Sequence, residues 1–390
     1  MTQVIETERS TAADRAALKE AAAEFTRREI APRIQEWEDA GELPRDLHRK
    51  AARAGLLGVG FAEEVGGLGG DALDMVAMQE GMFAEGASSG LMSALFTHGI
   101  AAPHIAAHGS DDLKTRWVAP TLAGELIGSL AITEPGGGSD VGSLRTTAVR
   151  DGDDYVINGA KTFITSGTRA DYVTTAVRTG GPGSGGISLV VVPTDTPGFG
   201  VDRRLAKMGW HCSDTAELSY VDVRVPVANL VGEQDAGFAY IAEQFVSERL
   251  ALAVHGYGIA ERSLRLTAQF CRERETFGEP LITRQAVRHK LVEMRRQVEA
   301  ARAHAHAVAA AYAESGVTVE TIAQVCLAKE TACNTASYVC DAAVQLHGGA
   351  GYMHGNEVER HYRDARLLPI GGGVTEVLAD LAAKLLGYTS

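Results

Sequence analysis

Ala131-Ile132-Thr133-Glu134-Pro135-Gly136-Gly137-Gly138-Ser139-Asp140 is the most informative stretch of this sequence. Three consecutive glycines between a threonine and a serine let the backbone approach a flat, polar ligand closely. The apolar residues 127–132 that lead into this loop predict a buried strand, so the loop would leave the core at a fixed angle. An isolated glycine run is more often a surface linker, but the preceding strand favours a binding site here.

The segment before this loop, residues 11–126, has the pattern of helices. Thr11 and Asp14 resemble a capping box, and Pro32 limits the first helix. Later apolar stretches continue the same spacing. We therefore expect a small helical bundle.

The segment after the loop, up to about residue 230, has the spacing of strands. Asn158-Gly159 lies between two β-prone runs and predicts a hairpin turn. Residues 181–186 match the glycine pattern of a dinucleotide-binding turn. Because a β-like run follows them instead of the required helix, they predict a hairpin loop.

After Gly237 the chain becomes helical again. Apolar residues from Val287 to Tyr312 alternate spacings of four and three, as in a helix packed lengthwise on others, and Gly316 is placed to end it. A second long helix is expected over residues 319–346. The sequence thus predicts an α+β fold: an N-terminal helical bundle in residues 1–125, a central antiparallel β domain in 126–233 and a C-terminal helical domain, similar to a four-helix bundle, in 234–390.

The composition narrows the possible functions. The chain has 390 residues, of which 45% are hydrophobic, and a net charge of −13, which argues against general affinity for nucleic acid or anionic lipid. Five cysteines without a Cys-x-x-Cys pair suggest a reducing compartment. The sequence has neither a membrane-spanning apolar run nor an apolar signal core at its N-terminus, so we expect a cytoplasmic protein without a membrane partner.

The sequence predicts no metal site. Cys326, Cys333 and Cys340 would share one helix face, but each step along that face is about 10 Å, too long for a shared metal ion. They are interpreted as small buried apolar residues. His304 and His306 point to different sides of their helix.

Four further motifs accompany the 131–140 stretch: Lys161-Thr162-Phe163-Ile164-Thr165-Ser166-Gly167, Met208-Gly209-Trp210-His211-Cys212-Ser213-Asp214-Thr215, Arg274-Glu275-Thr276-Phe277-Gly278 and Gln345-Leu346-His347-Gly348-Gly349-Ala350-Gly351. Together they resemble the motifs of acyl-CoA dehydrogenases, which are FAD flavoproteins, and they occur in that family's order along nearly the whole chain. The joint match is highly specific.

The resemblance implies α,β-desaturation of an acyl-CoA thioester. In that reaction a base removes the α-proton while flavin N5 accepts the β-hydrogen as hydride, and an electron-transferring flavoprotein is the expected electron acceptor. The resemblance also implies a homo-oligomer, either a tetramer or a dimer. A carboxylate can remove so weakly acidic a proton only in a dry site where the thioester oxygen receives hydrogen bonds.

The position of this base differs between branches of the family. One branch carries a glutamate near the C-terminus, but here Gly372 occupies that position and has no side chain to act. The isovaleryl and long-chain branches carry the base before an arginine on an earlier helix, which corresponds to Glu248-Arg249.

We therefore predict that Glu248, in the opening turn of a buried helix, is the general base. Apolar neighbours on its helix face would raise its pKa toward working pH. Gly372 would contribute its backbone N–H, and Arg249 would orient the base or the active-site loop and contact the substrate. The alternative is that Glu248 complements a helix N-terminus or pairs with a neighbouring arginine.

The resemblance also implies contacts to FAD. Ser139 would contact the flavin or the thioester arm, and Phe163 stands where many relatives have tryptophan. Because Val374 replaces a common threonine, Thr375 and Glu376 remain as polar candidates. The contacts near the flavin are Ile132, Thr133, Ser139, Phe163 and Thr165; those to the pyrophosphate and adenosine, partly from a neighbouring subunit, are Arg274, Thr276, Phe277, Gln285, Gln345, Gly348 and Gly349.

Other functions stay open from the sequence. An acyl-CoA oxidase or a dehydrogenase of carrier-protein thioesters would carry the same motifs. A flavin monooxygenase of the same fold would need no α-proton base, so Glu248 argues against it. A non-catalytic CoA-thioester-binding protein is favoured only by Gly372. The acyl chain length and branching cannot be derived from these motifs.

Overall fold

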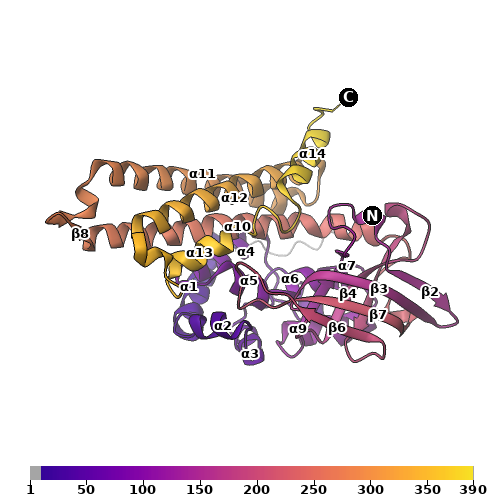
Figure 1. Ribbon diagram of the computed structural model, residues 1–390. Coiled ribbons are helices and arrows are strands. Elements are labelled where there is room, and N and C mark those ends of the chain that lie inside the picture. The colour runs from indigo at the N-terminus through magenta and orange to yellow at the C-terminus, as the bar shows by residue number, and fades with distance from the viewer. Residues whose placement is uncertain (1–9, 390) are drawn as a thin grey trace.

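The computed structural model describes residues 10–389, and the chain folds in three parts (Figure 1). The N-terminal part contains short helices around α1 and α4. The predicted capping box is confirmed, since the Asp14 N–H donates to the Thr11 hydroxyl at 3.2 Å and the Thr11 N–H donates to the Asp14 carboxylate at 2.9 Å. The helices are α1 (Ala12–Phe25), α2 (Ile34–Ala40), α3 (Arg45–Arg53), α4 (Ala72–Ala84), α5 (Ser89–Leu95), α6 (His98–Ala101), α7 (Pro103–His108), α8 (Asp111–Leu113) and α9 (Ala119–Leu122).

The central part is one seven-stranded sheet with the order β1-β4-β2-β3-β7-β6, in which β5 pairs with β4. Neighbouring strands are antiparallel, as predicted, except that β1 and β4 run parallel and β2 meets β4 in a single parallel pair. The predicted hairpin loop in residues 181–186 joins β4 to its antiparallel neighbour β5. The strands are β1 (Gly128–Ala131), β2 (Thr147–Asp151), β3 (Asp154–Thr165), β4 (Tyr172–Arg178), β5 (Ile187–Pro193), β6 (Phe199–Arg204) and β7 (Thr215–Pro226).

The hairpin turn predicted at Asn158-Gly159 is wrong. Both residues lie inside the continuous strand β3, where the register with β7 shifts by a bulge between Ile157 and Gly159. The Asn158 side chain bridges this bulge through two hydrogen bonds to Asp222 of β7. A Cβ at Gly159 would lie within 2.7 Å of the Thr146 backbone, so close approach of the chain, and not a turn, requires glycine here.

The C-terminal part consists of long helices. Gly316, with φ of 66°, ends α11 as predicted. The three cysteines of α12 are buried, as expected. The elements are α10 (Gly237–Glu273), the small hairpin β8 (Glu275–Thr276) and β9 (Glu279–Pro280), α11 (Gln285–Ser315), α12 (Val319–His347), α13 (Glu357–Ala365) and α14 (Thr375–Leu385).

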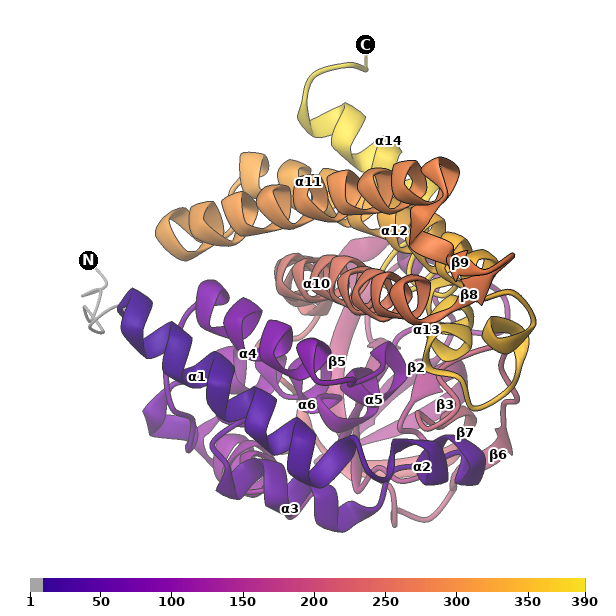
Figure 2. The same cartoon turned by 90° about the vertical axis from the view of Figure 1, so that its left-hand side faces the viewer.

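Helix α10 connects the three parts. It lies between the layer of α11 and α12 on one side and α4 with α1 on the other (Figure 2), and it also contacts β5 of the sheet. The largest hydrophobic cluster accordingly joins side chains of α1, α4, α5, α10 and α12. In the part of the chain that the structure describes, no helix is long and apolar enough to cross a membrane.

The contact between α1 and α4 is tested by Gly81→Ala. A Cβ at Gly81 would overlap the backbone carbonyl oxygen of Lys19, so the two helices would have to separate. Overpacking of this kind destabilises a protein by about 1–3 kcal/mol. The clash here is with the backbone of α1, which cannot move aside as easily as a side chain. We expect a melting temperature several degrees lower. The matched control is Gly99→Ala, where a Cβ meets no atom within 4 Å, and it should leave the melting temperature unchanged or raise it. Equal behaviour of the two variants would contradict the close approach.

Candidate active site

The two positions that the resemblance implies for the base lie close together. Glu248 lies on α10, and Gly372 lies in the loop of residues 371–373 that precedes α14. A Cβ built on Gly372 would lie 3.5 Å from Glu248 Oε1. A side chain at either position would therefore reach the same place.

One detail of the prediction for Glu248 is wrong. Helix α10 begins at Gly237, so Glu248 is its twelfth residue and does not lie in the opening turn. The helix starts earlier because residues 237–247 contain no proline or further glycine to interrupt it. The interpretation of Glu248 as a charge that complements a helix N-terminus is thereby excluded, since that effect fades within the first turn.

Glycine fits the backbone at position 372 without strain. The residue has φ of 64°, and a Cβ there would overlap the Leu252 side chain one turn beyond Glu248 on α10. Leu252 thus fills the space that a side chain at position 372 would need. With glycine at position 372, the 371–373 loop lies close to α10 and Leu252 keeps its place.

Two buried cations hold the 371–373 loop by its carbonyl groups. Arg249 Nε donates to the Gly372 carbonyl at 3.2 Å, and its guanidinium also lies 5.1 Å from the centre of the Phe245 ring. Lys329 of α12 donates to the carbonyls of Gly371 and Gly373, at 2.5 and 2.6 Å. The loop is therefore fixed to both α10 and α12.

Burial dominates the electrostatics of Glu248. It raises the pKa of the Glu248 carboxyl above its ordinary value, and the charges of Arg249 and Lys329 offset this only in part. Among the described residues, Glu248 has no hydrogen-bond or ion-pair partner, and it feels Arg249 and Lys329 only through their charges. A carboxylate that is desolvated but unpaired suits a general base.

The 131–140 loop is anchored by a buried ion pair. Glu134 accepts hydrogen bonds from Lys161 Nζ at 2.9 Å and from the N–H groups of Arg145 and Thr146 at 2.7 and 2.8 Å. Lys161 also donates to the Ile132 carbonyl at 2.9 Å. Burial opposes the charged form of Glu134, but Lys161 and the hydrogen bonds from Thr146 outweigh it and lower the pKa of the carboxyl.

Two of the three glycines of this loop face open space, and Gly138 packs against Thr133. None of the three has φ in the left-handed region, and a Cβ at Gly136 or Gly137 would meet no atom within 4 Å. Neither backbone strain nor internal packing therefore requires glycine at these two positions. Thr133 is half-buried and Ser139 is exposed.

Phe163 and Thr165 lie near the end of β3, next to this loop. The Thr162 N–H donates to the Thr133 carbonyl at 2.9 Å, which joins the two segments. Phe163 has φ of 60° and a side chain that is 68% exposed. A bulky residue with positive φ is strained, and such strain is found mainly at functional sites.

The remaining predicted contacts lie elsewhere in the same chain. The β8–β9 hairpin, with Phe277 99% exposed at its tip, lies at the far end of α10 from the sheet (Figure 1). Phe270 stacks on His347 with 4.3 Å between ring centres, which places the end of α12 at the same end of the bundle. The structure therefore brings Arg274, Thr276, Phe277, Gln285, Gln345, Gly348 and Gly349 to one end of the molecule, away from the residues near Phe163. Thr375 and Glu376 begin α14 and directly follow the 371–373 loop.

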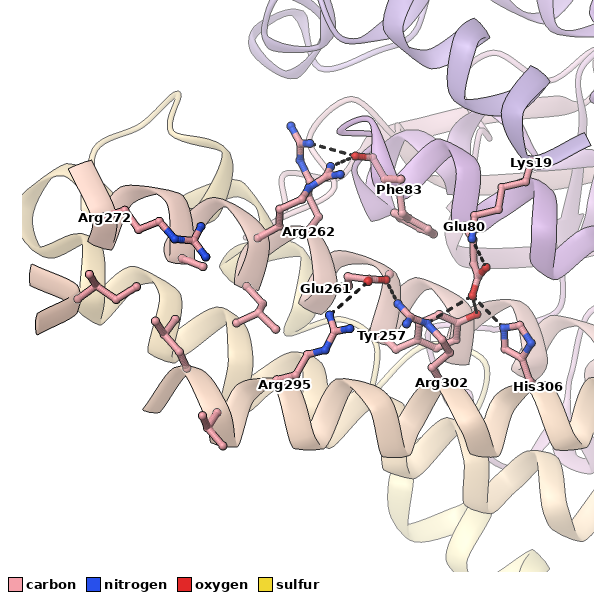
Figure 3. A pocket seen from close by; sticks show the side chains of 18 residues that line it. Lys19, Glu80, Phe83, Tyr257, Glu261, Arg262, Arg272, Arg295, Arg302 and His306 are labelled. Carbon is pink, nitrogen blue, oxygen red and sulfur yellow. Dashed lines mark hydrogen bonds and ion pairs between the residues drawn. The ribbon is translucent and has the colours of Figure 1, made fainter. Parts of the chain in front are cut away.

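A cleft of about 620 Å³ lies between α4, α10 and α11 (Figure 3). It contains none of the predicted site residues. Its buried carboxylate, Glu80, is already paired with Lys19 at 2.7 Å and His306 at 2.8 Å. The candidate site considered below is therefore the one at Glu248 and the 371–373 loop. Residues 10–389 contain no group of His, Cys, Asp or Glu that could hold a metal ion.

Comparison with known families shows to which family the chain belongs. Residues 12–125, 129–223 and 235–387 match the family models for the N-terminal, middle and C-terminal domains of acyl-CoA dehydrogenases. The chain belongs to the acyl-CoA dehydrogenase family. It is an oxidoreductase with that family's fold.

Individual relatives agree with this membership. The chain is 36% identical over 371 residues to the long-chain specific mitochondrial acyl-CoA dehydrogenase of Rattus norvegicus, covering 94% of this chain and 85% of that protein. A probable acyl-CoA dehydrogenase from Mycobacterium abscessus has a solved structure with 58% identity and a TM-score of 0.94, covering 97% and 100% of the two chains. A glutaryl-CoA dehydrogenase from Mycobacterium smegmatis, solved in complex with FADH2, has 26% identity and a TM-score of 0.89, covering 96% and 95%.

Three residues of this acyl-CoA dehydrogenase were given no role in the sequence analysis. Glu134 and Lys161 lie in quoted motifs, but their pairing joins segments 27 positions apart. Lys329 lies on the same helix face as Cys326 and Cys333, at spacings of three and four. A lysine on an apolar helix face was a usable signal, because such a residue needs buried acceptors.

Glu134→Gln tests the anchor of the 131–140 loop. Both oxygens of Glu134 accept hydrogen bonds, so the side-chain NH2 of a glutamine would face an N–H or ammonium donor. A buried donor left without an acceptor costs about 1–3 kcal/mol or more. We expect a melting temperature several degrees lower than that of the wild type. The control is Glu217→Gln, which breaks an exposed pair with Arg203 in the same sheet and should cost less than about 1 kcal/mol. A loss in the control as large as in Glu134→Gln would contradict the anchoring role.

Proposed function

We propose that this protein catalyses FAD-dependent α,β-desaturation of an acyl-CoA thioester, with Glu248 as the base that removes the α-proton. The observation that carries the proposal is the convergence of Glu248 and Gly372 on one place, 3.5 Å apart at the built Cβ. Membership of the acyl-CoA dehydrogenase family supports dehydrogenation of acyl-CoA in general. The cofactor, the base and the electron acceptor are our inference for this chain.

The residues near Phe163 fit a flavin. An exposed aromatic ring on strained backbone, glycines that face open space and the polar side chains of Thr133, Thr165 and Ser139 suit a flat, polar ring system. The glutaryl-CoA dehydrogenase of similar structure was solved with FADH2. When bound, FAD would supply the acceptor for the hydride that leaves the β-carbon.

The second group of predicted FAD contacts supports an oligomer. Arg274, Phe277 and Gln345 are exposed and belong to the end of the helical part that carries the β8–β9 hairpin, whereas Phe163 belongs to β3 of the sheet (Figure 1). We infer that the two groups of one chain serve different FAD molecules. A neighbouring copy would supply Arg274 for the pyrophosphate and Gln345 for the adenosine. We propose a homotetramer, or at minimum a dimer, on this ground.

The proton transfer follows from the surroundings of Glu248. The desolvated carboxylate gains stability on taking up a proton, which favours removal of the α-proton. As the proton leaves, negative charge develops on the thioester oxygen. Among the described residues the Gly372 N–H has no acceptor, so it is free to donate to that oxygen.

The electron acceptor leaves no signature in the site. By resemblance we propose an electron-transferring flavoprotein, with oxygen as the acceptor of an oxidase as the alternative. Stopped-flow reoxidation of the reduced protein by air and by that flavoprotein separates the two.

Glu248→Gln is the direct test of the base. We expect purified protein that is yellow with full flavin content but is not bleached by any acyl-CoA under anaerobic conditions, with a rate of flavin reduction at least about a hundredfold lower. The melting temperature should be unchanged or higher, since the charge of a half-buried carboxylate without a hydrogen-bond partner is removed. Glu243→Gln, which changes an exposed carboxylate on the same helix, is the matched control and should bleach normally. Unaltered bleaching in Glu248→Gln would reassign the base.

The rate of flavin reduction should depend on pH with a defined sign. The reaction needs ionised Glu248, and burial raises its pKa, so the rate should increase with pH and reach half of its maximum above the ordinary glutamate value of 4.5. Anaerobic stopped-flow absorbance over a pH series measures this midpoint. A midpoint at or below 4.5 would show that Glu248 is not desolvated during the reaction.

A further inference from the structure

Lys329 is a buried lysine whose hydrogen bonds all go to the 371–373 loop. The side chain belongs to α12 and is 2% exposed. Its ammonium group donates to the carbonyls of Gly371 and Gly373, at 2.5 and 2.6 Å, and to no carboxylate. Burying an ammonium group is unfavourable unless it makes hydrogen bonds, so losing either of these two hydrogen bonds would be costly.

The geometry of the peptide unit converts this contact into an orientation. In a trans peptide the carbonyl of one residue and the N–H of the next lie in one plane and point in opposite directions. When Lys329 holds the Gly371 carbonyl, the Gly372 N–H must therefore point away from α12. This N–H is the group that has no acceptor among residues 10–389.

Backbone hydrogen bonds hold the loop only at its two ends, where the Gly371 N–H donates to the Leu367 carbonyl at 2.9 Å and the Thr375 N–H to the Pro369 carbonyl at 3.1 Å. Residues 371–373 are all glycine, and Gly372 and Gly373 both have positive φ, at 64° and 104°. Glycine loses more conformational freedom on folding than any other residue, so such a loop keeps one conformation only if it is held. Arg249 fixes the Gly372 carbonyl, and Lys329 fixes the carbonyls on either side of it.

We propose that Lys329 is a positioning residue, which fixes the 371–373 loop so that the Gly372 N–H points toward the thioester oxygen of the substrate. This inference rests on the proposed function. Lys329 touches neither the base nor the reacting atoms. Its effect reaches the reaction through the direction of one N–H group.

The first test is independent of activity. In Lys329→Met, amide hydrogen exchange of the segment 371–375 should be at least about tenfold faster than in the wild type, because two charge-assisted hydrogen bonds are lost. Lys384→Met, which removes an exposed lysine on α14, is the control and should leave exchange in this segment unchanged. If Lys329→Met does not fold, Lys329→Gln, which keeps donors but is shorter, takes its place with the same expected direction.

The second test measures the hydrogen bond to the thioester. A 3-oxoacyl-CoA of the chain length that bleaches the wild-type flavin best has an acidic α-proton, and its enolate is detected by ultraviolet absorbance. In Lys329→Met we expect the flavin content to equal that of the wild type. The fraction of 3-oxoacyl-CoA bound as the enolate should decrease, and the rate of flavin reduction by acyl-CoA should fall about tenfold or more. A purely structural role of Lys329 would lower the melting temperature without changing the enolate fraction.

The outcomes separate the two proposals. Unchanged exchange in the 371–375 segment overturns the claim that Lys329 holds the loop. Faster exchange with an unchanged enolate fraction and unchanged flavin reduction shows a loop contact without a role in the reaction, and also overturns it. If the wild type is not bleached by any acyl-CoA, the proposed function fails and the positioning role fails with it, while the exchange result still decides whether Lys329 holds the loop.

Discussion

The arrangement of the site depends on the close approach between α10 and the 371–373 loop. Gly372 has no side chain here, so Leu252 can occupy the place that a Cβ at position 372 would enter. Glu248 then lies opposite the loop, within reach of the place that a side chain at position 372 would serve. On our proposal, a base at position 248 and a base at position 372 would serve the same place in the site.

The electrostatics of the site follow from this packing. Three charged groups, Glu248, Arg249 and Lys329, lie close together at the junction of α10 and α12. The two cations donate to loop carbonyls instead of pairing with the carboxylate, so burial still raises the pKa of Glu248. Bringing unpaired charges into a protein destabilises the fold. We interpret this as stability given up for reactivity, as is common at catalytic sites.

Much of the fold could be predicted from the sequence because its signals are local. The capping box of Thr11 and the end of α11 at Gly316 each depend on a few adjacent residues. The hairpin turn predicted at Asn158-Gly159 was wrong because the deciding contacts are not local. Its sequence is that of a hairpin turn, but Thr146 and Asp222, which lie far away in the chain, make it a bulge within one strand.

The site was only partly accessible from the sequence. The absence of a side chain at Gly372 pointed to Glu248, which required knowledge of a family pattern more than of periodicity. The helical segment was expected after Gly237, where α10 begins, but Glu248 was wrongly placed in its opening turn, because the motif around Glu248 does not show how far the helix extends before it. The role of Lys329 could not be derived, since which carbonyls it meets depends on how α12 packs against a loop 42 residues away.

The central claim is that Glu248 and the Gly372 N–H act on one thioester. The most direct measurement is a crystal structure of the oligomer with FAD and a non-reactive acyl-CoA analogue. Our account predicts a Glu248 oxygen about 3–3.5 Å from the α-carbon and the Gly372 nitrogen about 3 Å from the thioester oxygen. A Glu248 side chain turned away from the ligand, or another carboxylate at the α-carbon, would contradict it.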